Sequence, residues 1–69
     1  MDHKSIEQRL HLGLAALKSG DLAFAEEFFQ NFLSQNGDEI HSLHFLGVVL
    51  CEKGKLEAGI AFIEKSIYI

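Results

Sequence analysis

The stretches Leu12-Gly13 and Ser19-Gly20-Asp21-Leu22 are matched 34 residues later by Leu46-Gly47 and Lys53-Gly54-Lys55-Leu56, with both glycines and both leucines identical. A period of this length is typical of units made of two helices joined by a tight turn. A single unit cannot bury its apolar face alone, so neighbouring units must stack. The repeat therefore predicts an all-α fold, in which one domain over residues 1–69 consists of two stacked helical hairpins.

The pattern of apolar residues sets the expected bounds of these hairpins. The first is expected over residues 6–39 and the second over residues 40–69, the latter without its end or a capping helix. No stretch shows the alternation with period two that is typical of a strand. Four amphipathic segments instead predict four helices, over residues 6–18, 22–35, 39–53 and 56–69.

Each break between the predicted helices is centred on a glycine. Gly20 can take the left-handed conformation at a helix end, and Asp21 can accept hydrogen bonds from the first amides of the next helix. The segment Asn36-Gly37-Asp38 repeats this combination. At the third break Lys55 is a poor capping residue, so no cap marks the start of the last helix.

Composition restricts the kinds of partner. The 69 residues carry a net charge of −4 and include one cysteine and no proline. No segment clusters cations, so we expect no nucleic-acid partner. No apolar run approaches the about 18 residues of a membrane span. We therefore expect no membrane partner. A single cysteine excludes an internal disulfide and fits a reducing compartment, so the composition predicts a cytoplasmic protein.

The repeated residues resemble two copies of the tetratricopeptide repeat, a helical hairpin that stacks into a right-handed α-solenoid. The resemblance covers residues 6–69 and extends to further family positions, namely Ala25, Phe29 and Leu33 in the first unit and Gly59, Ile63 and Ile67 in the second. It implies that Gly13 and Gly47 let the two helices of a unit approach closely. Gly37 departs from the family, which usually has a helix-ending proline at this position.

The resemblance also implies a binding groove. In this family the first helix of each repeat lines a concave groove that holds an extended or helical peptide. The residues that match these positions are Glu7, Leu10, His11, Leu14, Leu17 and Lys18 in the first unit, and His41, His44, Phe45, Val48, Cys51 and Glu52 in the second. Half of them are apolar and few are cationic, which favours an apolar ligand helix over a clamp for a terminal carboxylate. The alternative for Leu14, Leu17 and Val48 is that they belong to the packing core.

The last predicted helix is apolar on two opposed sides. At about 100° per residue, Leu56, Ile60, Ile63 and Ile67 share one face, and Ala58, Phe62 and Ile69 lie on nearly the opposite face. Phe24 and Phe28, the first-unit counterparts of Ala58 and Phe62, are expected to be covered by the third helix. We therefore predict that Ala58, Phe62 and Ile69 form a face covered by a second copy or by further repeats after Ile69.

Metal binding and catalysis have little support. His41, His44 and Cys51 lie on one side of a predicted helix, where three borderline or soft ligands could converge. A fourth ligand is not evident, so we expect no metal and no cofactor. Cys51 lacks a partner in a known catalytic spacing, and the glycines form no phosphate-binding loop. We expect no catalytic residue and no enzyme activity within these residues.

These features together predict a protein–protein interaction module or scaffold that binds a peptide or helix in a mostly apolar groove and self-associates or continues into further repeats. Two alternatives stay open. The segment His41–Lys55 is similar to repeats that precede bacterial glycosyltransferase domains, so the chain could be the amino-terminal portion of a larger enzyme, serving substrate or assembly recognition. It could also be an autonomous small helical homo-oligomer.

Overall fold

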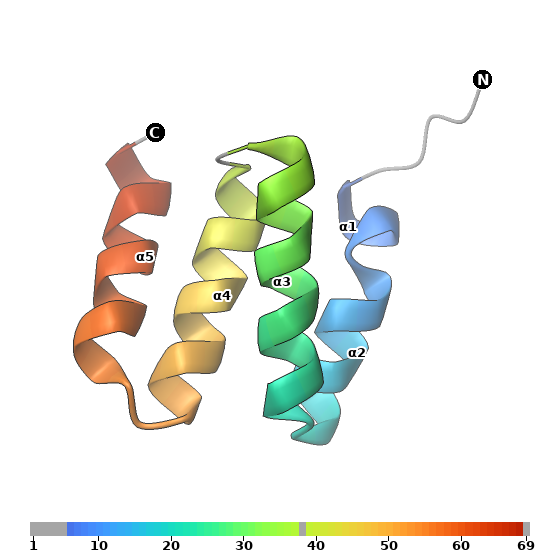
Figure 1. Ribbon diagram of the computed structural model, residues 1–69, viewed down its shortest axis with the longest axis horizontal. Helices are drawn as coiled ribbons and strands as arrows, with labels where there is room; N and C mark the ends of the chain where they lie inside the picture. The colour runs from blue at the N-terminus through green and yellow to red at the C-terminus, as the bar shows by residue number, and fades with distance from the viewer. Residues whose placement is uncertain (1–5, 38, 69) are drawn as a thin grey trace.

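The computed structural model describes residues 6–37 and 39–68, with side chains from residue 8 onward. The helices are α1 (Ile6–Arg9), α2 (His11–Ser19), α3 (Leu22–Asn36), α4 (Ile40–Glu52) and α5 (Leu56–Tyr68), and no strand occurs in these two ranges (Figure 1). The all-α prediction is confirmed. The expected helix bounds agree to within one residue, except that the first expected helix is divided and the last is described only as far as Tyr68.

The division falls at Leu10, between α1 and α2. Leu10 has φ −95° and ψ 6°, away from the ψ of about −42° of an α-helix, while its side chain is only 1% exposed. Arg9 ties the short α1 to the end of α3. Its guanidinium donates to Asn36 Oδ1 at 2.9 Å and lies 5.0 Å from the centre of the Phe32 ring. The helix therefore bends where Leu10 enters the core and Arg9 is held by α3.

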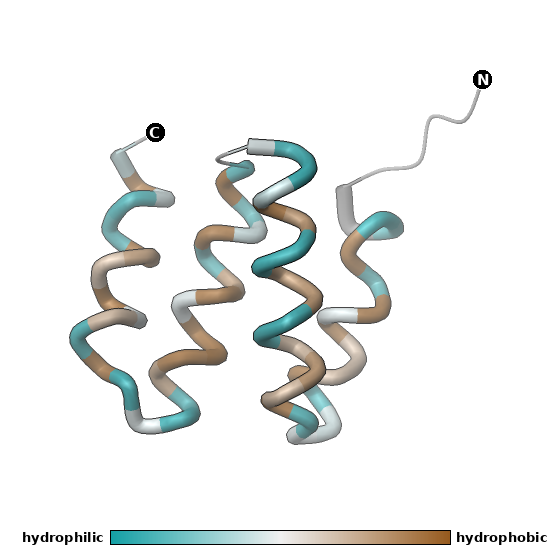
Figure 2. The backbone as a smooth tube through the Cα atoms, in the orientation of Figure 1, coloured by the Kyte–Doolittle hydropathy of each residue, from teal (hydrophilic) through white to brown (hydrophobic). Residues whose placement is uncertain are grey.

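Helices that follow one another in the sequence lie side by side in space, as α2–α3, α3–α4 and α4–α5 (Figure 1). The molecule is flat, with extents of 39 × 29 × 16 Å. Hydrophobic residues recur along the four longer helices, and α4, between α3 and α5, carries several in succession (Figure 2). The core cluster draws on α2, α3 and α4 and on Leu10 before α2, and Phe62 of α5 packs against it. Its members are Leu10, Ala16, Ala25, Phe29, Leu46, Val49 and Leu50.

Glycines allow the helices of each hairpin to approach closely, as the sequence predicts. A Cβ at Gly13 would lie 2.5 Å from Cδ1 of Phe28 and 2.8 Å from Cζ of Phe29, both on α3. A Cβ at Gly47 would lie 2.5 Å from Cγ1 of Ile63 and 2.7 Å from the carbonyl oxygen of Gly59, both on α5. At both glycines, a side chain would therefore push the two helices of the hairpin apart.

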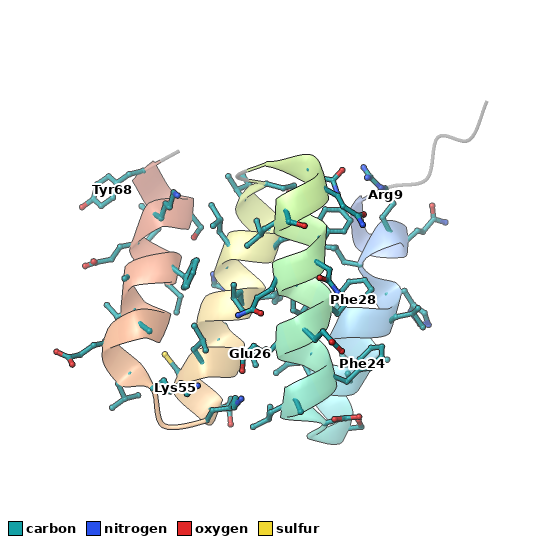
Figure 3. All side chains as sticks on the ribbon, in the orientation of Figure 1. Arg9, Phe24, Glu26, Phe28, Lys55 and Tyr68 are labelled. Atoms are coloured by element: carbon teal, nitrogen blue, oxygen red, sulfur yellow. The ribbon has the colours of Figure 1, made fainter. Side chains whose placement is uncertain are left out.

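The structure corrects the expected faces of α3 and α5. Phe24 and Phe28 point from α3 toward α2 of their own hairpin, not toward α4 (Figure 3). By the same packing, Phe62 is half-buried against the core rather than uncovered. Ala58 is exposed as expected, and Ile69 lies outside the described residues. The large apolar side chains that α5 leaves exposed belong instead to Leu56, Ile60, Ile67 and Tyr68.

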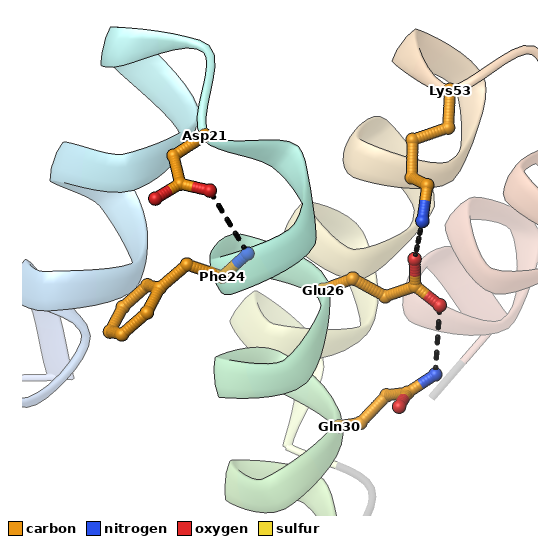
Figure 4. Close-up of polar contacts among 5 residues, drawn as sticks. All are labelled: Asp21, Phe24, Glu26, Gln30 and Lys53. Atoms are coloured by element: carbon orange, nitrogen blue, oxygen red, sulfur yellow. Dashed lines mark hydrogen bonds and ion pairs between the residues drawn. The ribbon is translucent and has the colours of Figure 1, made fainter.

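The turns within the two hairpins, at Gly20 and Gly54, share the same glycine conformation and the same backbone hydrogen bond across the turn. Gly20 has φ 86°, and the amide of Asp21 donates to the carbonyl of Ala16 at 2.8 Å. Thirty-four residues later Gly54 has φ 85°, and the amide of Lys55 donates to the carbonyl of Leu50, also at 2.8 Å. The predicted cap is confirmed, because Asp21 Oδ1 accepts a hydrogen bond from the Phe24 amide at 3.3 Å (Figure 4).

Replacing Gly47 with alanine should lower the free energy of unfolding by about 1–3 kcal/mol, because the new Cβ meets the α5 backbone. This loss should occur although alanine favours helix formation over glycine by about 1 kcal/mol. Urea unfolding followed by far-UV circular dichroism measures it. The control is Ala61→Gly on the exposed side of α5, which should cost about 1 kcal/mol of helix propensity. A Gly47→Ala protein as stable as the parent would contradict the close contact.

Candidate functional site

The predicted groove residues of the second unit share one side of α4. His41, His44 and Glu52 are exposed, and Phe45, Val48 and Cys51 are half-buried. The rest of the helix packs inward, with buried residues Ser42, Leu43, Leu46, Gly47, Val49 and Leu50. The six positions therefore form one continuous surface, which we call the α4 face.

The predicted groove residues of the first unit are less accessible. The expectation for Leu10 is wrong, because its side chain is buried in the core. Leu14 and Leu17 are half-buried and pack against the core cluster, which supports the alternative of a packing role. His11 and Lys18 are exposed on α2, and the side chain of Glu7 lies outside the described residues.

Phe45 is the anchor of the α4 face. Its ring stacks on Phe29 of α3 with ring centres 5.7 Å apart, at an interplanar angle of 28°. The ring of His44 meets it edge-on at 5.3 Å. Cys51 is a free, half-buried cysteine, and its Sγ would lie 2.5 Å from a Cβ at Gly59. The α4 face therefore has a half-buried floor of Phe45, Val48 and Cys51, in which Phe45 is fixed by its stacking on Phe29, and polar side chains border it.

Glu39 holds the amino-terminal end of α4, and sequence reasoning missed this role. Its carboxylate accepts from the amide of His41 at 3.0 Å, and from the amide and hydroxyl of Ser42 at 2.8 and 2.9 Å. Ser42 is fully buried, so this bond satisfies its hydroxyl. Asp38, in the segment expected to cap this helix, lies outside the described residues. The signal for Glu39 is an acidic residue directly before the first turn of a helix.

The same hydrogen bonds set the charge of Glu39. Partial burial raises the pKa of its carboxyl, but the amides of His41 and Ser42 and the Ser42 hydroxyl lower the pKa by more. The pKa therefore lies below its ordinary value of 4.5. Glu39 is ionised at neutral pH and stabilises the helix end that carries His41 and His44.

A second polar arrangement, on α3, joins the two hairpins. Lys53 forms an ion pair with Glu26, and Gln30 donates to the same carboxylate at 3.3 Å (Figure 4). The Lys53 hydrogen bond lowers the pKa of Glu26 more than partial burial raises it. These residues line an open hollow of about 540 Å³ together with Ala23, Phe24 and Glu27. Because Glu26 and Lys53 are 27 residues apart, no local spacing in the sequence predicts their contact.

The candidate metal ligands of α4 do not form a cluster of three in the described part of the chain. Among the residues that the structure describes, no group of three or more His, Cys, Asp or Glu side chains could hold a metal ion. His41, His44 and Cys51 share the α4 face without forming such a group. Within the same part of the chain, no helix is long and apolar enough to cross a membrane.

Comparisons of the chain with family models, with curated proteins and with solved structures gave no match.

Replacing Glu39 with alanine should lower the free energy of unfolding by about 1 kcal/mol near neutral pH, through loss of the helix cap. Because the folded-state pKa of Glu39 is lowered, its contribution is present above the ordinary value of 4.5 and is lost as the pH falls through the folded value. The difference between parent and variant should therefore shrink in acid. Urea unfolding of the parent and the variant, from neutral pH down to below the ordinary pKa of 4.5, measures the effect.

The matched control for this experiment is Glu64→Ala, which removes an exposed glutamate from α5. Its effect on the free energy of unfolding should stay small at every pH. A Glu39→Ala effect that is independent of pH would contradict the role of the ionised carboxylate.

Proposed function

We propose that this chain is a protein–protein interaction module that binds an apolar helix or extended peptide on the α4 face. The observation that carries the proposal is the half-buried floor of Phe45, Val48 and Cys51, bordered by exposed His41, His44 and Glu52. Binding sites of this kind combine apolar contact area with a few polar groups that orient the ligand. The resemblance to tetratricopeptide repeats supports the same surface.

Rigidity favours the α4 face as a binding surface. Phe45 is held between Phe29 and His44, so it loses little conformational freedom when a ligand covers it. Aromatic side chains that are fixed in this way contribute strongly to binding at interfaces. A partner helix would lay apolar residues of spacing i, i+3 and i+7 along this floor.

The polar border suggests the charge of the ligand. Glu52 lies at one end of the face, and the whole chain carries a net charge of −4. A neutral or basic amphipathic helix fits this surface better than an acidic one, because like charges would oppose its approach. His11 and Lys18 on α2 are the exposed groups available to a ligand that extends past α4.

A phage-displayed library of amphipathic helical peptides, selected against the full chain, tests the proposal. The strongest peptide should shift the NMR signals of His41, His44 and Val48 in the isotope-labelled protein. The variant His44→Glu should weaken its binding about tenfold, because a charge replaces the ring that borders the floor. His44 is exposed, so the fold should be retained.

Ala61→Glu, which places the same charge on the exposed side of α5, is the control and should leave peptide affinity unchanged. Selection of no peptide above background, or signal shifts confined to α5, would contradict binding on the α4 face.

A further inference from the structure

One side of α5 exposes a row of large apolar residues. Leu56, Ile60 and Ile67 are 58%, 50% and 70% exposed. At about 100° per residue the three lie within one narrow stripe, which we call the α5 row. No element of the described part of the chain packs over this stripe. Contiguous apolar surface of this kind is unfavourable in water and is typical of an interaction site.

The internal repeat shows how the equivalent stripe is covered in the first hairpin. Thirty-four residues before the α5 row lie Leu22, Glu26 and Leu33 of α3. There, α4 lies against α3: Glu26 pairs with Lys53, the residue that follows α4, while Leu22 and Leu33 are half-buried and pack against the core cluster. On the α4 side, Lys53 forms this ion pair at the end of the helix, and Leu46 and Val49 are buried members of the same core cluster.

The opposite end of the molecule exposes the counterpart of that cover. Thirty-four residues before Leu46, Val49 and Lys53 lie Leu12, Ala15 and Ser19 of α2, which we call the α2 row. All three are exposed, and Leu12 is 61% exposed although it is a large apolar residue. The molecule therefore presents one half of the α3–α4 junction on α5 and the other half on α2.

We propose that the α5 row of one copy docks on the α2 row of a second copy, so that the α3–α4 junction is repeated between molecules. The residues that replace the internal ion pair fit this contact. Ile60 stands at the position of Glu26, and Ser19 at the position of Lys53. When the two copies dock, no unpaired charge is therefore buried at these two positions. Burial of such a charge would be unfavourable.

This contact joins two different surfaces, so each added copy leaves one α2 row and one α5 row free. Such a heterologous interface generates open chains or rings instead of closed two-fold dimers. The contact uses one row of one helix on each side, which is small beside the about 1,200–2,000 Å² of stable interfaces. We expect association that is weak and concentration-dependent. The proposal is independent of ligand binding, because the α4 face takes no part in it.

Sedimentation equilibrium over a series of concentrations tests the proposal with two complementary variants of the full chain. The parent should increase in mass with concentration beyond a dimer. Leu12→Glu blocks the α2 row, and Ile60→Glu blocks the α5 row, so each variant alone should remain monomeric. Their equimolar mixture should form a complex of two chains and no larger species, because one intact α2 row meets one intact α5 row.

Three results would overturn the proposal. A parent chain that stays monomeric at every concentration excludes self-docking. A Leu12→Glu protein that associates while Ile60→Glu does not indicates a two-fold contact between α5 helices. Two monomeric variants whose mixture is also monomeric indicate that the two rows do not meet.

Both substituted side chains are exposed, and circular dichroism checks that the helices are retained. The milder pair Leu12→Ser and Ile60→Ser should give the same pattern of loss and recovery without an added charge. Ala61→Glu, on the exposed side of α5 outside the α5 row, should associate like the parent.

Discussion

The backbone contact between α4 and α5 is the constraint on which the second hairpin depends. A Cβ at Gly47 would lie 2.7 Å from the carbonyl oxygen of Gly59, and a Cβ at Gly59 would lie 2.7 Å from that of Gly47. Neither helix can therefore carry a side chain at this crossing. The close approach brings Ile63 against Gly47 and, together with α3 on the other flank, leaves α4 buried on two sides.

That burial determines which surface α4 can offer to a partner. A helix covered by both neighbours retains one exposed side, and on α4 this is the side of His41, His44 and Glu52. The stacking of Phe45 on Phe29 fixes the middle of this side, and the Glu39 cap fixes its amino-terminal end. The α4 face is thus a consequence of packing, and its shape is set by contacts made elsewhere in the helix.

Local rules predict the parts of this molecule that depend on one or two residues. The turn at Gly20 and the cap at Asp21 follow from backbone conformation and side-chain chemistry, whereas the close approach at Gly13 is expected from the resemblance to a helical repeat. The prediction for the uncovered face of α5 is wrong, because periodicity shows that two sides of a helix are apolar but not which of the two a neighbouring helix covers. The burial of Leu10 likewise depends on a bend in the backbone that helix periodicity does not predict.

The ion pair between Glu26 and Lys53 distinguishes the internal junction from the two ends of the molecule. Such a partly exposed pair contributes little stability, and it forms only where Glu26 and Lys53 face each other. At the two ends of the molecule, Ile60 and Ser19 occupy the equivalent positions. A charged residue there would oppose docking unless an opposite charge on the second copy paired with it. The attraction there comes from apolar area alone, at about 25 cal/mol per Å². A contact between copies has no such ion pair, so the fit of Leu12 against Leu56 and Ile60 must determine how the two helices align.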